Sequence, residues 1–102
     1  MKEVKAILQP FMLQDVLRGL AKVDSLPAVT VSQVDGHSVA HPDYKPSPKT
    51  KLEIMVPDEF VDAVVNTIQR CARTGKPGDG RIFVIDVATT VKIRTGERGT
   101  AD

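Results

Sequence analysis

Apolar and polar residues alternate along residues 2–9, and this alternation places Val4, Ala6 and Leu8 on one face. A period of two residues predicts a β-strand, which Pro10 ends. Beyond the proline, apolar residues recur at intervals of three and four, the spacing of one face of an α-helix. The positions that share this face are Leu13, Val16, Leu17 and Leu20. The chain therefore begins with a predicted strand and a predicted helix.

Two further strands are predicted on either side of a proline-rich segment. Residues 29–35 are rich in β-branched side chains, and residues 50–56 alternate again. The apolar face of the later strand contains Leu52, Ile54 and Val56. The intervening residues 36–49 contain three prolines that disfavour regular structure, at Pro42, Pro46 and Pro48. A loop of this length in a compact domain favours a functional role over a plain connection.

A second helix and two final strands complete the pattern. Helical spacing returns after Asp58, which we expect to cap the helix, and continues to about Arg73. The apolar face of this helix consists of Val61, Val64, Val65, Ile68 and Ala72. Residues 81–87 predict a fourth strand, and residues 91–94 predict a short fifth. The order β-α-β-β-α-β with a short extra C-terminal strand predicts an α+β, ferredoxin-like sandwich made by one domain, residues 1–102.

The face of the sheet opposite the helices carries apolar side chains, where a solvated face would be polar. Residues 82–85 are apolar on both sides of their strand, and Ile7 and Met55 lie opposite the helix-facing positions. Burial of this face between subunits is the simplest physical explanation. The sequence therefore predicts an oligomer, although ferredoxin-like domains with many functions assemble in this way.

Composition narrows the class of protein. The 102 residues carry a net charge of +1 and only 4% are aromatic, so neither general nucleic-acid binding nor stacking on bases is indicated. Cys71 is the single cysteine, which rules out an internal disulfide. The sequence has no signal peptide and no apolar run of about 18 residues, which predicts a cytoplasmic protein without direct membrane insertion. Basic residues outnumber acidic ones seven to three within residues 69–99, which suits an anionic ligand or a solvated basic surface.

The segment 74–81, Thr-Gly-Lys-Pro-Gly-Asp-Gly-Arg, is the strongest candidate for binding chemistry. Three glycines within six residues let the backbone approach a ligand closely and direct N–H groups into one concavity. Lys76 and Arg81 add cations that suit phosphate. The segment is not a Walker A loop, because it precedes a strand and lacks the Gly-Lys-Ser/Thr ending. A glycine-rich turn after a helix is the structural alternative.

The segment 91–99 is a second candidate. Alternation along a strand would place Lys92 and Arg94 on one face and Val91 and Ile93 on the other. Two adjacent cations near the end of the chain could clamp a polyphosphate. The alternative is an edge strand that its charges protect from aggregation.

Taken together, these segments resemble the P-II family of nitrogen regulatory proteins over nearly the whole chain. The resemblance rests on KAILQPFML, VTVSQVDG, KLEIMVPDEFVDAVVNTIQ, RTGKPGDGRIFVIDV and KIRTGERG. It implies ferredoxin-like subunits that assemble as homotrimers and bind ATP or ADP in the cleft between neighbouring subunits. Such a protein regulates a membrane transporter or an enzyme and is not itself an enzyme.

The resemblance also implies which residues bind the nucleotide. The phosphate-binding loop, residues 74–81, and the C-terminal segment of a neighbouring subunit, residues 91–102, would hold the phosphates through Gly78, Asp79, Gly80, Arg81, Lys92 and Arg94. Lys49 would reach the phosphates from the base of the shortened loop, residues 36–49. The base and ribose would contact Ile7, Thr30, Gly36, Glu53, Ile54 and Met55.

The sequence departs from the family pattern at several places, among them Arg81, where lysine is common, and Lys92, where arginine is common. Gly36 is followed by His-Ser-Val-Ala in place of the family's Gly-Arg-Gln stretch, and Gln9 replaces the usual lysine before Pro-Phe. These departures argue against binding of Mg²⁺ and 2-oxoglutarate, and the proline-rich surroundings of Tyr44 argue against its uridylylation. The shortened loop resembles that of atypical P-II proteins associated with bicarbonate handling or heavy-metal efflux.

Three other hypotheses stand beside the nucleotide-binding regulator. A metal-binding regulator linked to heavy-metal efflux would use His37 and His41, which are four residues apart, with Asp43 close by. An enzyme is disfavoured, because no His-Asp-Ser or Cys-His arrangement is apparent. A structural trimer without a nucleotide site would have the same fold.

Overall fold

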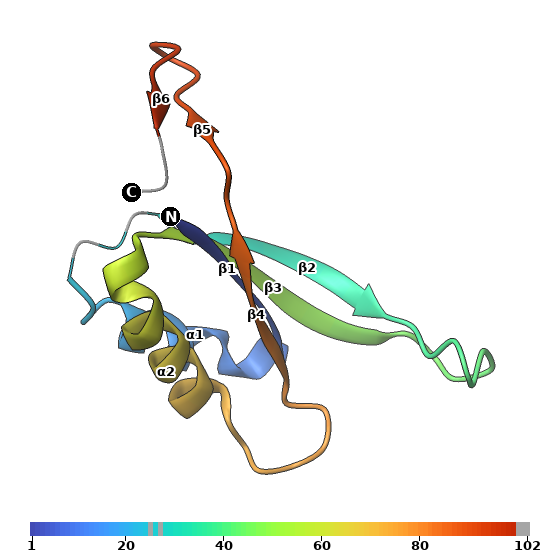
Figure 1. Cartoon of the computed structure of the whole chain (residues 1–102). Coiled ribbons are helices and arrows are strands. Elements are labelled where there is room, and N and C mark those ends of the chain that lie inside the picture. Colours follow the sequence, from blue (N-terminus) through green and yellow to red (C-terminus); the bar gives the residue numbers. More distant parts are fainter. Residues whose placement is uncertain (25, 27, 100–102) are drawn as a thin grey trace.

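The chain forms two layers, an antiparallel sheet and a pair of helices that cover one of its faces (Figure 1). The computed structural model describes residues 1–24, 26 and 28–99. The elements are β1 (Lys2–Leu8), the 3-10 helix η1 (Pro10–Met12), α1 (Leu13–Leu20), β2 (Thr30–Gly36), β3 (Ser47–Val56), the 3-10 helix η2 (Asp58–Phe60), α2 (Val61–Ala72), β4 (Gly80–Asp86), β5 (Thr90–Val91) and β6 (Arg98–Gly99). The four-stranded sheet has the order β2-β3-β1-β4, and β5 and β6 form a separate hairpin. This arrangement confirms the predicted α+β, ferredoxin-like sandwich.

The core lies between the helices and the central strands. Antiparallel pairing places Val4 opposite Ile54 and Ala6 opposite Leu52. The side chains that these strands direct towards the helices are almost fully buried, as the two-residue alternation predicted. The helices contribute Val16, Leu20, Val64, Ile68 and Ala72. Removal of these apolar side chains from water supplies the main driving force for folding.

The two helices are short and pack closely against each other. A Cβ atom on Gly19 of α1 would lie 2.7 Å from Sγ of Cys71 and 3.0 Å from Cγ2 of Thr67, both on α2. Glycine lowers the helix propensity of α1, but a larger residue at this position would force the helices apart. Within the part of the chain that the structure describes, no helix is long and apolar enough to cross a membrane.

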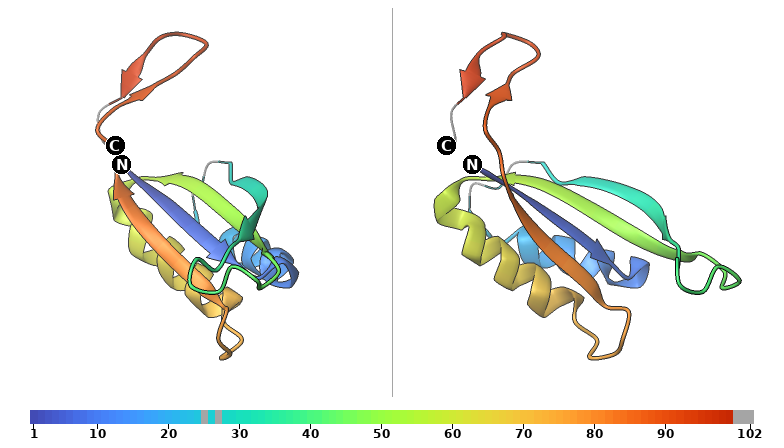
Figure 2. Two further views of the ribbon diagram at one scale, coloured as in Figure 1. Left: turned by 90° about the vertical axis from the view of Figure 1, so that its right-hand side faces the viewer. Right: turned by 45° about the vertical axis from the view of Figure 1, so that its right-hand side comes forward.

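Both helices lie on one face of the sheet (Figure 2). The opposite face, which we call the open face, carries a mixture of apolar and charged side chains. At the edge strand β4, Phe83 and Ile85 are 45% and 40% exposed. Towards the middle of the sheet, Lys5 and Lys51 each approach a glutamate of the same strand at 3.8 Å. The large exposed apolar side chains of the open face, which the sequence of residues 82–85 predicted, therefore lie along β4.

The proline-rich segment contains more strand than predicted. β3 begins at Ser47, so it includes Pro48, which lies opposite Asp35 of β2. The pairing of β3 with β1 extends only to Thr50, and beyond that residue β3 is paired with β2 alone. A proline is tolerated at such an edge, because its missing N–H leaves no ladder bond broken. The loop between β2 and β3 is thus residues 37–46.

The predicted cap of the second helix is wrong. Asp58 begins η2, and its carboxylate accepts a hydrogen bond from the amino group of Met1 at 2.7 Å. α2 follows η2 directly, and its N-cap residue, Phe60, makes no side-chain capping bond. The carboxylate therefore serves a contact between the start of the chain and η2.

Candidate functional site

The loop between α2 and β4 is held in one shape by its own hydrogen bonds. We call residues 74–81 the glycine-rich loop. The carboxylate of Asp79 accepts hydrogen bonds from the N–H groups of Thr74 and Gly75, both at 2.9 Å, and from the Thr74 hydroxyl. These bonds, led by that of the hydroxyl, lower the pKa of the Asp79 carboxyl below its usual value. Asp79, which the family resemblance implied as a phosphate contact, therefore stabilises the shape of the loop through hydrogen bonds to other residues of the same loop.

Three glycines supply the backbone shape of this loop. Gly75, Gly78 and Gly80 have positive φ angles of 88°, 95° and 101°, a region that other residues rarely adopt. At Gly80, a Cβ atom would lie 1.7 Å from the carbonyl oxygen of Ile7, because β4 begins here directly against β1. The sequence predicted that the glycines let the backbone approach a ligand closely. At Gly80 the close approach is instead to β1 of the same chain.

Lys49 connects the glycine-rich loop to the β2–β3 hairpin. Its Nζ donates a hydrogen bond to the carbonyl oxygen of Gly78 at 2.8 Å. A Cβ atom on Gly78 would lie 3.1 Å from Nε2 of Gln9 and 3.7 Å from Nζ of Lys49. Three separate segments therefore meet at Gly78. The ammonium group of Lys49 therefore lies at the edge of the loop.

The residues expected to contact base and ribose are divided by the register of the sheet. The side chains that share the open face are those of Ile7, Thr30, Glu53 and Met55. Along β1 and β3, the residues next to these positions are buried against the helices, and Thr30 of β2 is paired with Glu53 of β3. Gly36 lies at the far end of β2, opposite Ser47. The side chain of Ile54 is 1% exposed in the core, so only its backbone is available to a ligand.

The predicted strand face for Lys92 and Arg94 is wrong. The strand ends at Val91, and a turn follows, in which the Lys92 N–H donates to the Glu97 carbonyl at 2.9 Å and the Gly96 N–H donates to the Lys92 carbonyl at 2.7 Å. This turn joins β5 to β6. The sequence did not predict β6, so the strand with which β5 pairs was also not predicted. The β5–β6 hairpin stands away from the sheet, beyond the end of β4 that is opposite the glycine-rich loop (Figure 1). Within one chain, these cations do not meet the loop.

The loop histidines show no metal site. The ring of His41 stacks on the ring of Tyr44, with 4.7 Å between their centroids. Among the described residues, no three His, Cys, Asp or Glu side chains are grouped so that they could hold a metal ion. The hypothesis of a metal site at His37 and His41 therefore finds no support.

A cleft of about 340 Å³ opens between the end of α2 and the adjoining parts of β1 and β4. Its lining contains four of the predicted site residues, namely Ile7, Asp79, Gly80 and Arg81. The other lining residues are Ala6, Leu8, Ile68, Gln69, Ala72, Arg73 and Ile82.

Sequence reasoning missed Gln69 and Arg73 as lining residues of this cleft. They are four residues apart, so they lie on one side of the helix end. Arg73 directly precedes the glycine-rich loop, and this position together with the spacing is the signal that could have indicated both.

The sequence matches the profile of a family described as nitrogen regulatory protein P-II over residues 1–97. The chain belongs to the P-II family. Nitrogen regulatory protein P-II 1 of Escherichia coli K12 is 46% identical over 111 aligned positions, which cover 99% of this chain and 98% of that protein. The nitrogen regulatory protein P-II of Pasteurella multocida is 42% identical over 107 positions, with 95% of each chain covered.

A solved P-II structure confirms the fold. The crystal structure of Arabidopsis thaliana PII bound to citrate matches with a TM-score of 0.83 and 44% sequence identity, and the match covers 96% of this chain and 87% of that one. Membership in the P-II family makes this chain a regulatory signalling protein, as the sequence predicted. The alignment with the E. coli protein has 111 positions, nine more than the 102 residues of this chain, so at least nine residues of that protein have no counterpart here.

Proposed function

We propose that this P-II protein binds ATP or ADP between the subunits of a homotrimer and regulates a transporter or an enzyme through residues 37–46. The observation that carries the proposal is the glycine-rich loop, which Asp79 holds in shape and at whose rim the Lys49 ammonium lies. A glycine-rich loop of fixed shape beside a cation suits the phosphates of a nucleotide. The citrate bound to the Arabidopsis relative is also a polyanion.

The position of the β5–β6 hairpin supports a site shared between subunits. Lys92 and Arg94 lie beyond one end of β4, and the glycine-rich loop lies at the other end (Figure 1). A seven-residue strand spans roughly 20 Å, so these cations contact a phosphate in that loop only in another copy of the chain. Ile93 is fully exposed and Val91 is half-exposed, which suits burial of the hairpin against a neighbouring subunit.

The loop of residues 37–46 is the proposed contact with the regulated partner. Val39 and Tyr44 are 94% and 65% exposed, and apolar side chains at a loop tip suit recognition of another protein. At least nine residues of the E. coli protein have no counterpart in this chain, and a chain shortened in this way fits the short-loop members of the family. Because Gly36 is not followed by Gly-Arg-Gln, we expect nucleotide binding without Mg²⁺ or 2-oxoglutarate.

Equilibrium binding of labelled ATP, ADP and AMP, combined with light scattering, tests the proposal. We expect a mass of three chains and one ATP or ADP per chain. Arg94→Ala should weaken binding of ATP by about 1.5–3 kcal/mol, because it removes a charged contact to phosphate. The control is Arg18→Ala on α1, which removes an exposed arginine of the helix layer. A stable trimer that binds none of the three nucleotides would leave the structural-trimer hypothesis in place.

A further inference from the structure

The floor of the cleft at the end of α2 lies on the helix side of the sheet, although four of the lining residues, Ile7, Asp79, Gly80 and Arg81, are also proposed nucleotide contacts. Its floor is formed by side chains that β1, β4 and α2 direct into the space between the layers, namely Ala6, Leu8, Ile68, Ala72 and Ile82. Strand alternation points the side chains of Ile7 and Arg81 the opposite way, onto the open face. The cleft and the open face are therefore two distinct sites that share the backbone around Gly80.

Small residues create this hollow. Ala6 and Ala72 present only methyl groups, and Gly80 lies so close to β1 that a Cβ atom there would clash with Ile7. The resulting volume of about 340 Å³ falls within the range of sites for small molecules, about 300–1,000 Å³. The floor is apolar, so it suits a hydrocarbon group.

The rim of the cleft is polar and positively charged. Gln69, in the last turn of α2, and Arg73, which directly follows the helix, are both exposed. The guanidinium of Arg73 lies along the glycine-rich loop, with three of its atoms within 4.0 Å of the Cβ position of Gly75. The ion pairs formed within 4.0 Å by the described residues do not include Arg73. The hydrogen bonds from Thr74, and then that from Gly75, lower the pKa of the Asp79 carboxyl more than the nearby charge of Arg73 does, and no ion pair joins the two side chains within 4.0 Å. The guanidinium of Arg73 therefore keeps its donors for a further anion.

We propose that this cleft binds a small carboxylate with a short alkyl chain. The planar carboxylate accepts hydrogen bonds from the Arg73 guanidinium and the Gln69 amide, and the alkyl chain covers the apolar floor. A guanidinium matches the two oxygens of a carboxylate, which favours this class over an uncharged ligand of the same length. This site and its ligand do not depend on the proposed function.

Occupation of the cleft has a consequence for the glycine-rich loop. Asp79 and Gly80 line the cleft and also belong to that loop. A ligand in the cleft therefore contacts the loop from the helix side, while a nucleotide would contact it from the open face. If the proposed nucleotide site exists, the two ligands change each other's affinity by the same factor.

Nuclear magnetic resonance titration of the full chain, without nucleotide, tests the site. Hexanoate should shift the amide signals of Gln69, Arg73 and Gly80. Hexanol, which has the same chain and no charge, should bind at least about tenfold more weakly, because it lacks the ion pair. Butanoate should bind more weakly than hexanoate by about fourfold for each methylene removed.

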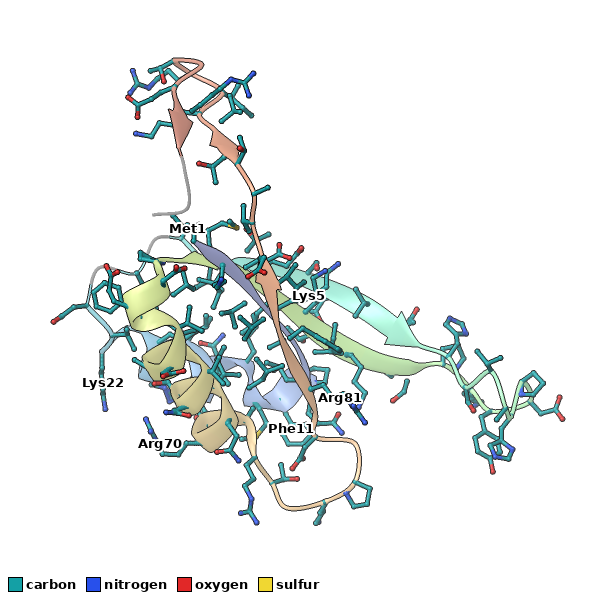
Figure 3. The ribbon with its side chains drawn as sticks, in the orientation of Figure 1. Met1, Lys5, Phe11, Lys22, Arg70 and Arg81 are labelled. Atoms are coloured by element: carbon teal, nitrogen blue, oxygen red, sulfur yellow. The ribbon has the colours of Figure 1, made fainter. Side chains whose placement is uncertain are left out.

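Two variants and one control sharpen the test. Arg73→Gln should abolish the difference between hexanoate and hexanol, whereas Ala72→Leu should fill the floor and abolish binding of both. Arg70→Gln is the matched control, because Arg70 also belongs to α2 but lies on its side away from β4 (Figure 3). It should leave both affinities unchanged.

Three results would overturn the proposal. The first is an absence of shifts at the cleft with millimolar hexanoate, and the second is equal binding of hexanoate and hexanol by the unmodified protein. The third is a protection of the cleft amides from hydrogen exchange that increases with protein concentration and is accompanied by loss of hexanoate binding, since a second copy of the chain would then cover the cleft. Because no nucleotide is present, none of these results bears on the nucleotide proposal.

Discussion

The glycine-rich loop and the β2–β3 loop are both exposed connections, but they are held in different ways. The glycine-rich loop depends on one carboxylate, that of Asp79, which binds three donors, and on glycines with positive φ angles. In residues 37–46, the His41 N–H donates to the Ser38 hydroxyl at 3.1 Å, and the Tyr44 N–H donates to the His41 carbonyl at 3.0 Å. The first arrangement is anchored to the sheet at Gly80, and the second consists of contacts within the loop.

This difference suggests different roles for the two loops. A loop whose shape is fixed in advance binds a ligand with little loss of conformational entropy. A loop held by a few internal contacts can change shape without disturbing the sheet, as recognition of a partner requires. Lys49 is the side chain that joins them, since it lies on β3 at the base of one loop and donates to Gly78 of the other.

The most damaging change to the glycine-rich loop is Gly80→Ala. The new Cβ atom would lie 1.7 Å from the carbonyl oxygen of Ile7, and the φ angle of 101° would be strained. We expect the free energy of unfolding to fall by at least about 3 kcal/mol, measured by urea denaturation. The control is Gly96→Ala, where φ is 71° and no atom lies within 4 Å of the Cβ position. It should cost only about 1 kcal/mol, and equal losses would show that close approach to β1 is unimportant.

Asp79→Ala removes the organising carboxylate and leaves the strands intact. We expect faster amide hydrogen exchange across residues 74–80 and about tenfold weaker binding of ATP and ADP, because the loop would then have to be ordered by the ligand. The free energy of unfolding should change little, since the loop is exposed. Asp43→Ala in the β2–β3 loop is the control and should alter neither quantity. Unchanged exchange in Asp79→Ala would contradict the assigned role of the carboxylate.

The pH dependence of the same loop follows from the lowered pKa of Asp79. A carboxyl with a depressed pKa in the folded state contributes stability above its usual value of 3.8, and this contribution is lost as pH falls through the folded pKa. The Gly75 amide signal should therefore stay constant from neutral pH downwards and move only below about pH 4. Asp79→Asn should remove this transition, and a transition near pH 6 would point to another group.

Lys49→Met separates the two loops. It removes the hydrogen bond to Gly78 and the cation at the rim, so we expect nucleotide binding to weaken by about three- to tenfold. In the free protein, hydrogen exchange should increase in residues 74–80. Lys22→Met is the control, because Lys22 lies after α1 on the helix side of the molecule (Figure 3). If exchange increases but affinity does not change, Lys49 supports the loop and does not contact the ligand.

Most of the fold was predictable because packing imposes a period on the sequence. The strands β1 and β3 and the helices α1 and α2 followed from positions that face the core, and most of these positions are buried. The errors arose where a distant segment decides the outcome. Asp58 has the chemistry of a cap, but its carboxylate binds the amino group of Met1, 57 residues away. Pro48 lies in a strand, because β1 has ended before that point and only β2 is paired.

The candidate site was predictable where one segment carries it. The glycines and Asp79 are consecutive, so their joint geometry follows from local sequence. The face assigned to Lys92 failed because the pairing of β5 with β6 ends the strand at Val91. Gln69 and Arg73 were missed because the cleft is formed by three elements, and no local pattern specifies a space between elements.

Tyr44→Ala should have the smallest effect on the isolated protein, and it tests whether the two loops are separate units. The ring is 65% exposed and stacks on His41, so its loss should change the free energy of unfolding by less than about 0.5 kcal/mol. Nucleotide affinity, measured by calorimetry, should stay within about twofold, because the glycine-rich loop keeps its own hydrogen bonds. Hydrogen exchange should increase only in residues 37–46. A tenfold loss of ATP binding in this variant would mean that the β2–β3 loop helps to form the nucleotide site, and the division of roles between the two loops would then be wrong.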